Sequence, residues 1–129
     1  MGYRLAGPEL KRERGGELAS HGVKAKGYKS DAANHKEAEE LVNAVVSEFG
    51  TVDVLVNNAG ITHAADIFDL SEADFDRVID VNLKAAFLLS QAAGRDMARR
   101  KSGVIINISS INAVVAIPNQ IAYAASKGA

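Results

Sequence analysis

Hydrophobic residues along the chain occur in two patterns, short continuous runs and helical repeats. Residues 52–56 and 104–108 are almost entirely Val, Leu and Ile, which predicts strands buried on both faces of a parallel sheet. We interpret the weaker run 23–28 as a third strand. Helical spacing, with Asn34 and Ser71 as N-caps, predicts four helices. These helices cover residues 9–20, 34–49, 71–97 and 122–129.

The predicted strands and helices alternate along the chain. That order is typical of a doubly wound parallel sheet in the α/β class. No internal repeat and no low-complexity linker divides the sequence, so we expect residues 1–129 to belong to one domain. The glycine fingerprint of dinucleotide-binding turns, G-x-G-x-x-G, does not occur in the chain.

Composition and charge narrow the possible functions. Of the 129 residues, 47% are hydrophobic, and 15 Lys and Arg against 16 Asp and Glu leave a net charge of −1. This balance gives no reason to expect nucleic acid or a membrane as a partner. The chain has no cysteine, and its three histidines lack the spacing of metal ligands, so we expect no metal site. We expect a cytoplasmic location, because no apolar run approaches the roughly 18 residues that span a bilayer.

Three polar features follow predicted strands, at the edge where open α/β sheets bind their ligands. Residues 57–60, Asn-Asn-Ala-Gly, combine amide side chains with small residues that let a ligand approach the backbone. Two serines, Ser109 and Ser110, follow the next strand. Tyr123 and Lys127 lie four residues apart, and therefore on one face of a helix.

A tyrosine beside a lysine can carry acid–base chemistry. A phenol has a reference pKa near 10, and a neighbouring ammonium favours the phenolate. Tyr123 and Lys127 can therefore form a proton donor and acceptor near neutral pH, while a serine hydroxyl holds the oxygen of a carbonyl or an alcohol. Taken singly, these features also fit a helix-surface pair, a strand-end turn and a plain loop.

The order and spacing of the features favour a common site, with Tyr123 thirteen residues after Ser110. Together with Asn82 in a Val-Asn-Leu-Lys stretch and with Tyr-Ala-Ala-Ser-Lys at 123–127, they resemble the successive motifs of the short-chain dehydrogenase/reductases. The likeness covers nearly the whole chain. In the amino acids of these motifs, the chain is most similar to bacterial 3-oxoacyl-acyl-carrier-protein reductases and to sugar and polyol dehydrogenases.

The resemblance implies a catalytic set formed by Asn82, Ser110, Tyr123 and Lys127. Tyr123 would be the general acid and base, and Lys127 would assist it and bind the nicotinamide ribose. Ser110 would orient the substrate oxygen, and Asn82 would support a water in the proton relay. The resemblance implies NADP or NAD as the cofactor. Its implied binding residues, besides Tyr123 and Lys127, are Asp31, Ala32, Asn58, Ala59 and Gly60.

The resemblance further implies a partial, Rossmann-like NAD(P)-binding domain of three layers, α/β/α. Compared with the family, the first strand with its Gly-rich turn and the last strands are missing. We therefore expect the remaining strands to lose helices that cover them, and this chain alone to bind the cofactor weakly, with little or no turnover.

The function that the resemblance implies is that of an NAD(P)-dependent oxidoreductase, which interconverts a carbonyl and a secondary alcohol and acts on a 3-oxoacyl thioester. A sugar or polyol dehydrogenase is the alternative within the class, and a catalytically inactive fragment that only associates is the alternative outside it. The implied partners are the substrate and an acyl carrier protein, and the full-length protein is expected to be a homotetramer or homodimer. Association would use Phe87, Leu88 and Leu89. The cluster Arg95, Arg99, Arg100 and Lys101 is interpreted either as a docking surface or as a solvated helix end.

Overall fold

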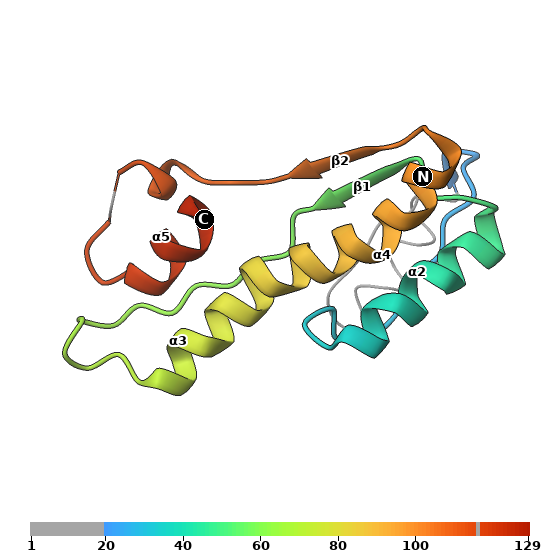
Figure 1. Cartoon of the computed structure of the whole chain (residues 1–129). Helices are drawn as coiled ribbons and strands as arrows, with labels where there is room; N and C mark the ends of the chain where they lie inside the picture. Colours follow the sequence, from blue (N-terminus) through green and yellow to red (C-terminus); the bar gives the residue numbers. More distant parts are fainter. Residues whose placement is uncertain (1–19, 116) are drawn as a thin grey trace.

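The computed structural model describes residues 20–115 and 117–129 (Figure 1). Its elements are α2 (His35–Phe49), β1 (Val54–Asn57), α3 (Glu72–Ile79), α4 (Ala85–Arg100), β2 (Val104–Asn107) and α5 (Ile121–Gly128). A π-helical turn, Asp80–Lys84, joins α3 to α4, and a 3-10 turn, Ile111–Ala113, follows β2. The alternation of helices and strands confirms the α/β class. The helix predicted for 9–20 lies, except for its last residue, outside the described residues.

The strands β1 and β2 form a parallel pair, as predicted. Val54 lies beside Val104, and Asn57 lies beside Asn107. The β1 strand starts later than the predicted run 52–56, and it extends to Asn57. Backbone pairing explains that extension, because the Ile108 N–H donates to the Asn57 carbonyl at 3.0 Å. The Asn57 Nδ2 adds a side-chain hydrogen bond to the Asn107 Oδ1 at 2.8 Å.

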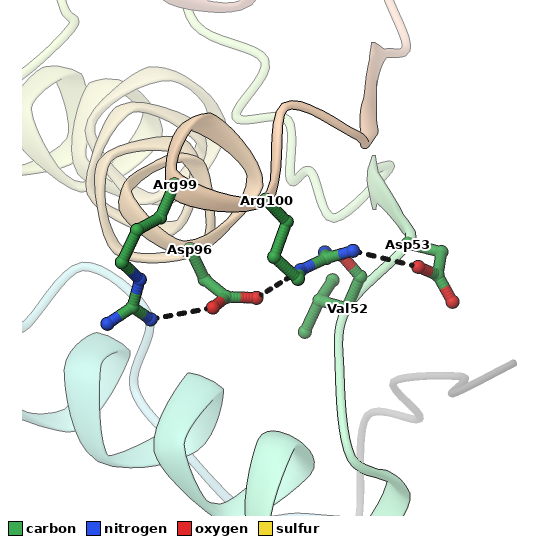
Figure 2. A network of polar contacts seen from close by, with 5 residues as sticks. All are labelled: Val52, Asp53, Asp96, Arg99 and Arg100. Atoms are coloured by element: carbon green, nitrogen blue, oxygen red, sulfur yellow. Dashed lines mark hydrogen bonds and ion pairs between the residues drawn. The ribbon is translucent and has the colours of Figure 1, made fainter.

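A network of polar contacts explains the late start of β1 (Figure 2). Arg100, at the end of α4, donates to the Val52 carbonyl at 2.9 Å and to the Asp53 carboxylate at 3.3 Å. The Val52 carbonyl is therefore bound by a side chain instead of a neighbouring strand. On α4, Asp96 accepts from both Arg100 and Arg99 at 2.7 Å. These two hydrogen bonds, that from Arg100 foremost, hold the pKa of Asp96 below its ordinary value.

The segment 23–28 does not form the predicted third strand. Within the described residues the sheet consists of β1 and β2, and a segment without a neighbouring strand cannot form a ladder of backbone hydrogen bonds. Side chains attach the segment to α2 instead. Lys24 and Lys26 both bind the Glu48 carboxylate, and the Tyr28 hydroxyl donates to the Ala44 carbonyl at 3.4 Å.

A core of apolar side chains lies between α2 and α4, which run side by side (Figure 1). Asn34 starts α2 as predicted, because its side chain accepts from the Glu37 N–H. Gly50 ends the helix with φ at 89°, a conformation that favours glycine. The buried apolar residues of the two helices are Ala38, Val42, Ala85, Leu88, Leu89, Ala93 and Met97.

The two strands are not buried on both faces, contrary to the prediction. Leu55 packs against the core and Asn57 bonds to α4, whereas Val56, between them, is 52% exposed. Because side chains alternate along a strand, the residues on the side away from α4 form one open apolar face. For the part of the chain that the structure describes, this exposure agrees with the expectation that the strands lose helices that cover them. The open face consists of Val54, Val56, Val104, Ile106 and Ile108, all exposed.

The helix predicted for 71–97 is present as α3 and α4, but it contains a turn that the sequence does not indicate. Ser71 caps α3 by accepting from the Asp74 N–H at 3.1 Å. Between the two helices, the Ala85 N–H donates to the Asp80 carbonyl five residues earlier, which makes the turn π-helical. Asn82 lies in this wide turn and is buried.

The association surface predicted at residues 87–89 is wrong for two of its three residues. Phe87 is 59% exposed, but Leu88 and Leu89 are buried in the core. On a helix, residues one position apart point in different directions, so a run of three apolar residues cannot share one surface. Within the described ranges, no helix is both long and apolar enough to cross a membrane.

The contacts of Glu48 predict an unusual titration. Hydrogen bonds from Lys26 and Lys24 lower the pKa of Glu48 from 4.5 to about 2. Stability from this cluster is therefore present above about pH 4.5 and is lost as the pH falls through about 2. In a carbon-13 NMR titration, Lys26→Ala should raise the Glu48 pKa toward 4.5, and Lys24→Ala should raise it by less. A midpoint near 4.5 in the unsubstituted protein would contradict this.

Candidate active site

A cavity of about 480 Å³ lies beyond the carboxyl ends of β1 and β2, beside the start of α5. Three of the predicted catalytic residues line it: Ser110, Tyr123 and Lys127. Asn58 and Gly60, from the loop after β1, line the same cavity. The parallel pairing brings these segments together, because it places the ends of both strands at one edge.

Asn82 fixes the loop after β1 by binding both backbone groups of one residue. Its Oδ1 accepts from the Ile61 N–H at 2.8 Å, and its Nδ2 donates to the Ile61 carbonyl at 2.9 Å. Nδ2 also donates to the Ser126 hydroxyl at 2.9 Å. Asn82 is 7% exposed, so these contacts are shielded from water. The side chain of Asn82 therefore joins the loop, the π-helical turn and α5.

Ser126 continues this connection into α5. It is 4% exposed, accepts from Asn82 and donates to the Tyr123 carbonyl at 2.8 Å. Ser126 is not among the site residues predicted from the sequence. Its position three residues after Tyr123 is the available signal, because a helical serine can bond to a carbonyl of the preceding turn.

Lys127 is attached to the end of β2. Its Nζ donates to the Ile108 carbonyl at 2.7 Å and lies 5.9 Å from the centre of the Tyr123 ring. The Ser109 hydroxyl donates to the Lys127 carbonyl at 2.7 Å, so contacts in both directions join α5 to the segment after β2. An ammonium has three N–H donors, so further donors remain for a ligand in the cavity.

Ser110 caps the 3-10 turn that follows β2. Its hydroxyl oxygen accepts from the Asn112 N–H at 3.2 Å, which leaves the hydroxyl hydrogen able to donate elsewhere. Asn112 is buried, and its Nδ2 donates to the Gln120 Oε1 at 2.9 Å. Both amides line the cavity. They bound the stretch 112–120, which we expect from the sequence to help decide between a thioester and a sugar substrate, although neither amide is among the predicted site residues.

The remaining cofactor residues implied by the resemblance lie apart from this cavity. Asp31 is in the turn before α2, where its Oδ1 accepts from the Ala33 N–H at 3.0 Å. Ala32 is buried in the core, so its side chain does not reach a ligand. Ala59 is exposed but does not line the cavity.

The basic cluster at the end of α4 is largely paired within the chain. Arg95 binds Glu39 at 2.7 Å, and Arg99 and Arg100 both bind Asp96. This cluster lies near the start of β1, at the opposite end of the strand pair from α5 (Figure 1). The described contacts fit a neutralised, solvated helix end better than a basic docking surface.

Comparison with known proteins identifies the family. The short chain dehydrogenase family model matches residues 6–129, and the chain therefore belongs to this family of NAD(P)-binding oxidoreductases. The chain is 41% identical to the 3-oxoacyl-[acyl-carrier-protein] reductase FabG of Staphylococcus epidermidis, over 86% of this chain and 46% of the relative.

Solved structures confirm the partial Rossmann fold. An NAD+-bound xylitol dehydrogenase superposes with a TM-score of 0.93 at 32% identity, over 98% of this chain and 49% of that one. A gluconate 5-dehydrogenase from Burkholderia cenocepacia, in complex with NADP and tartrate, superposes with a TM-score of 0.90 at 31% identity, over 98% of this chain and 50% of that one. The chain spans about half the length of the curated relatives it matches. We call the chain completed to that length the full-length enzyme.

The contacts of Asn82 predict a large effect of its removal on stability. Asn82→Ala in the full-length enzyme loses three hydrogen bonds and should lower the free energy of unfolding by roughly 2–4 kcal/mol. Ser126→Ala should cost about 1 kcal/mol. The exposed Ser47→Ala is the control and should stay within about 0.5 kcal/mol. Equal effects of Asn82→Ala and Ser47→Ala in urea denaturation would contradict the role of Asn82.

Proposed function

We propose that the full-length enzyme interconverts a carbonyl compound and a secondary alcohol with NAD or NADP. The observation that carries this proposal is the common cavity of Ser110, Tyr123 and Lys127 at the strand ends. A phenol, an ammonium and a hydroxyl around one space are what proton transfer to a substrate oxygen requires. Membership of the short chain dehydrogenase family supports the same chemistry.

The residues on one side of the cavity fit the nicotinamide end of the cofactor. A Cβ added to Gly60 would lie 3.4 Å from the Asn82 Oδ1 and 3.6 Å from the Lys127 Nζ, so the missing side chain leaves this point open. We propose that Asn58, Gly60 and Lys127 hold the cofactor there. When bound, NAD(P)H supplies the hydride.

In the proposed reduction, the protein places a proton on the substrate oxygen. The Tyr123 hydroxyl donates this proton, and the Ser110 hydroxyl binds the same oxygen. The positive charge of Lys127, 5.9 Å from the Tyr123 ring, stabilises the phenolate that remains. Asn82 is proposed as a positioning residue, because its side-chain amide is already hydrogen-bonded to the Ile61 backbone and to the Ser126 hydroxyl. In oxidation the same groups act in reverse.

We infer a 3-oxoacyl thioester as the substrate, attached to acyl carrier protein. Similarity to the S. epidermidis reductase supports this choice. A sugar or polyol is the second candidate, because the chain superposes on a xylitol dehydrogenase and a gluconate 5-dehydrogenase with TM-scores of 0.93 and 0.90. Steady-state rates with acetoacetyl thioesters, xylitol and gluconate distinguish the two, and turnover of the polyols alone would reject the thioester.

The described chain by itself is proposed to be a poor catalyst. Its open face of five β-branched residues is unlike the covered faces of parallel sheets. In a fluorescence titration, the 129-residue chain should bind NADPH much more weakly than the full-length enzyme does. Equal affinities would contradict this expectation. Size-exclusion chromatography tests the alternative of an inactive fragment that only associates. In that case the 129-residue chain would elute as a discrete dimer or tetramer.

The proposed role of Tyr123 predicts a selective loss. Tyr123→Phe in the full-length enzyme should lower kcat for carbonyl reduction by about 10²–10⁴-fold, since the proton donor is removed. The Kd for NADPH should change little, because the ring remains. Tyr28→Phe is the matched control, as its hydroxyl contacts α2 away from the cavity, and it should keep its activity. Retained activity in Tyr123→Phe would reject the proposed function.

A further inference from the structure

We propose that Ser109 is a positioning residue for Lys127, because its hydroxyl fixes the backbone of Lys127 and thereby the place of the ammonium in the cavity. This inference rests on the proposed function and concerns the same cavity, which both residues line. The observation that carries it is the hydrogen bond from the Ser109 hydroxyl to the Lys127 carbonyl, at 2.7 Å.

The two serines that follow β2 use their hydroxyl groups in opposite ways. A carbonyl only accepts hydrogen bonds, so the single hydroxyl hydrogen of Ser109 points to Lys127. The Ser110 hydroxyl oxygen accepts from the Asn112 N–H at 3.2 Å, so the hydrogen of Ser110 remains for a ligand. Ser110 is therefore the serine that can donate to a substrate oxygen, and Ser109 acts through another residue.

Lys127 is held at both ends of its side chain by two consecutive residues. Its carbonyl is bound by Ser109, and its Nζ donates to the Ile108 carbonyl at 2.7 Å. The stem of a lysine is flexible, so an ammonium whose backbone is loose can occupy several positions. With both ends attached to the end of β2, the Nζ stays 5.9 Å from the centre of the Tyr123 ring.

Removal of the Ser109 hydroxyl should loosen the lysine without detaching α5. Ser109 is exposed, and the loss of an exposed contact has little effect on stability. The helix keeps the buried hydrogen bond from Asn82 to Ser126 at 2.9 Å. It also lies against the 3-10 turn, where a Cβ added to Gly128 would be 3.5 Å from the Ala113 carbonyl oxygen. Cofactor binding and stabilisation of the phenolate, which both depend on the ammonium, should therefore weaken together.

The test measures cofactor binding and turnover in the full-length enzyme. Ser109→Ala should raise the Kd for NADPH and lower kcat for carbonyl reduction, each by about three- to tenfold, the range for one lost hydrogen bond. Ser109→Thr keeps a hydroxyl and should return both values to within about twofold of the unsubstituted enzyme. Ser102→Ala, at an exposed serine before the other end of β2, is the control and should change neither value. The midpoint of urea denaturation should stay unchanged in all three variants.

A double-variant cycle tests whether Ser109 acts through the ammonium. Lys127→Met keeps an unbranched apolar stem and removes the charge. In this background, Ser109→Ala should change the Kd for NADPH by less than about twofold, because no ammonium is left to be positioned. A fluorescence titration measures this Kd without turnover, so the cycle can be completed even if Lys127→Met is inactive.

Each other outcome rejects a specific statement. If Ser109→Ala raises the Kd equally in both backgrounds, Ser109 contacts the cofactor itself, and this inference fails while the proposed function stands. The inference also fails if Ser109→Ala leaves the Kd and kcat unchanged, or if the urea midpoint falls in step with them, since the role of Ser109 would then be structural. If the unsubstituted enzyme neither binds NADPH nor reduces a carbonyl compound, the proposed function fails, and this inference fails with it.

Discussion

The buried hydrogen bonds of Asn82 are the interaction on which the rest of the site depends. One amide binds both backbone groups of Ile61 and the hydroxyl of Ser126, so three separate segments share one fixed point. Buried contacts of this kind are stronger than exposed ones, because no water competes for the same donors and acceptors. Besides Asn82, the loop after β1 is joined to the segment before α5 by the Ala65 N–H, which donates to the Asn119 carbonyl at 3.0 Å.

Side-chain contacts at both ends of the strand pair fix its position. Arg100 joins the end of α4 to the residues before β1, while Asn57 joins the end of β1 to β2 and to Ser90 on α4. The short strands are therefore held at both ends by side chains. This arrangement keeps their carboxyl ends together, where the cavity lies.

Local signals in the sequence were sufficient for part of this structure. The caps Asn34 and Ser71, the parallel pairing of two apolar runs, and the common cavity of Ser110, Tyr123 and Lys127 follow from residue type and spacing. The absent third strand and the exposed sheet face depend on which neighbours are present, and periodicity carries no information on neighbours. The pair of Asn112 and Gln120 joins two loops across a turn, and no local pattern predicts such a contact.

The wide turn at Asp80–Lys84 contains one residue more than a regular helical turn of the same span. Each residue of an α-helix rotates the chain by about 100°. A wide turn absorbs its extra residue within one turn, so deleting a single residue there would restore a regular helix and leave α3 and α4 nearly in their present relative orientation. The residues inside the turn would move instead, and Asn82 would lose the position from which it binds both backbone groups of Ile61, so the length of this turn is as constrained as the identity of the asparagine.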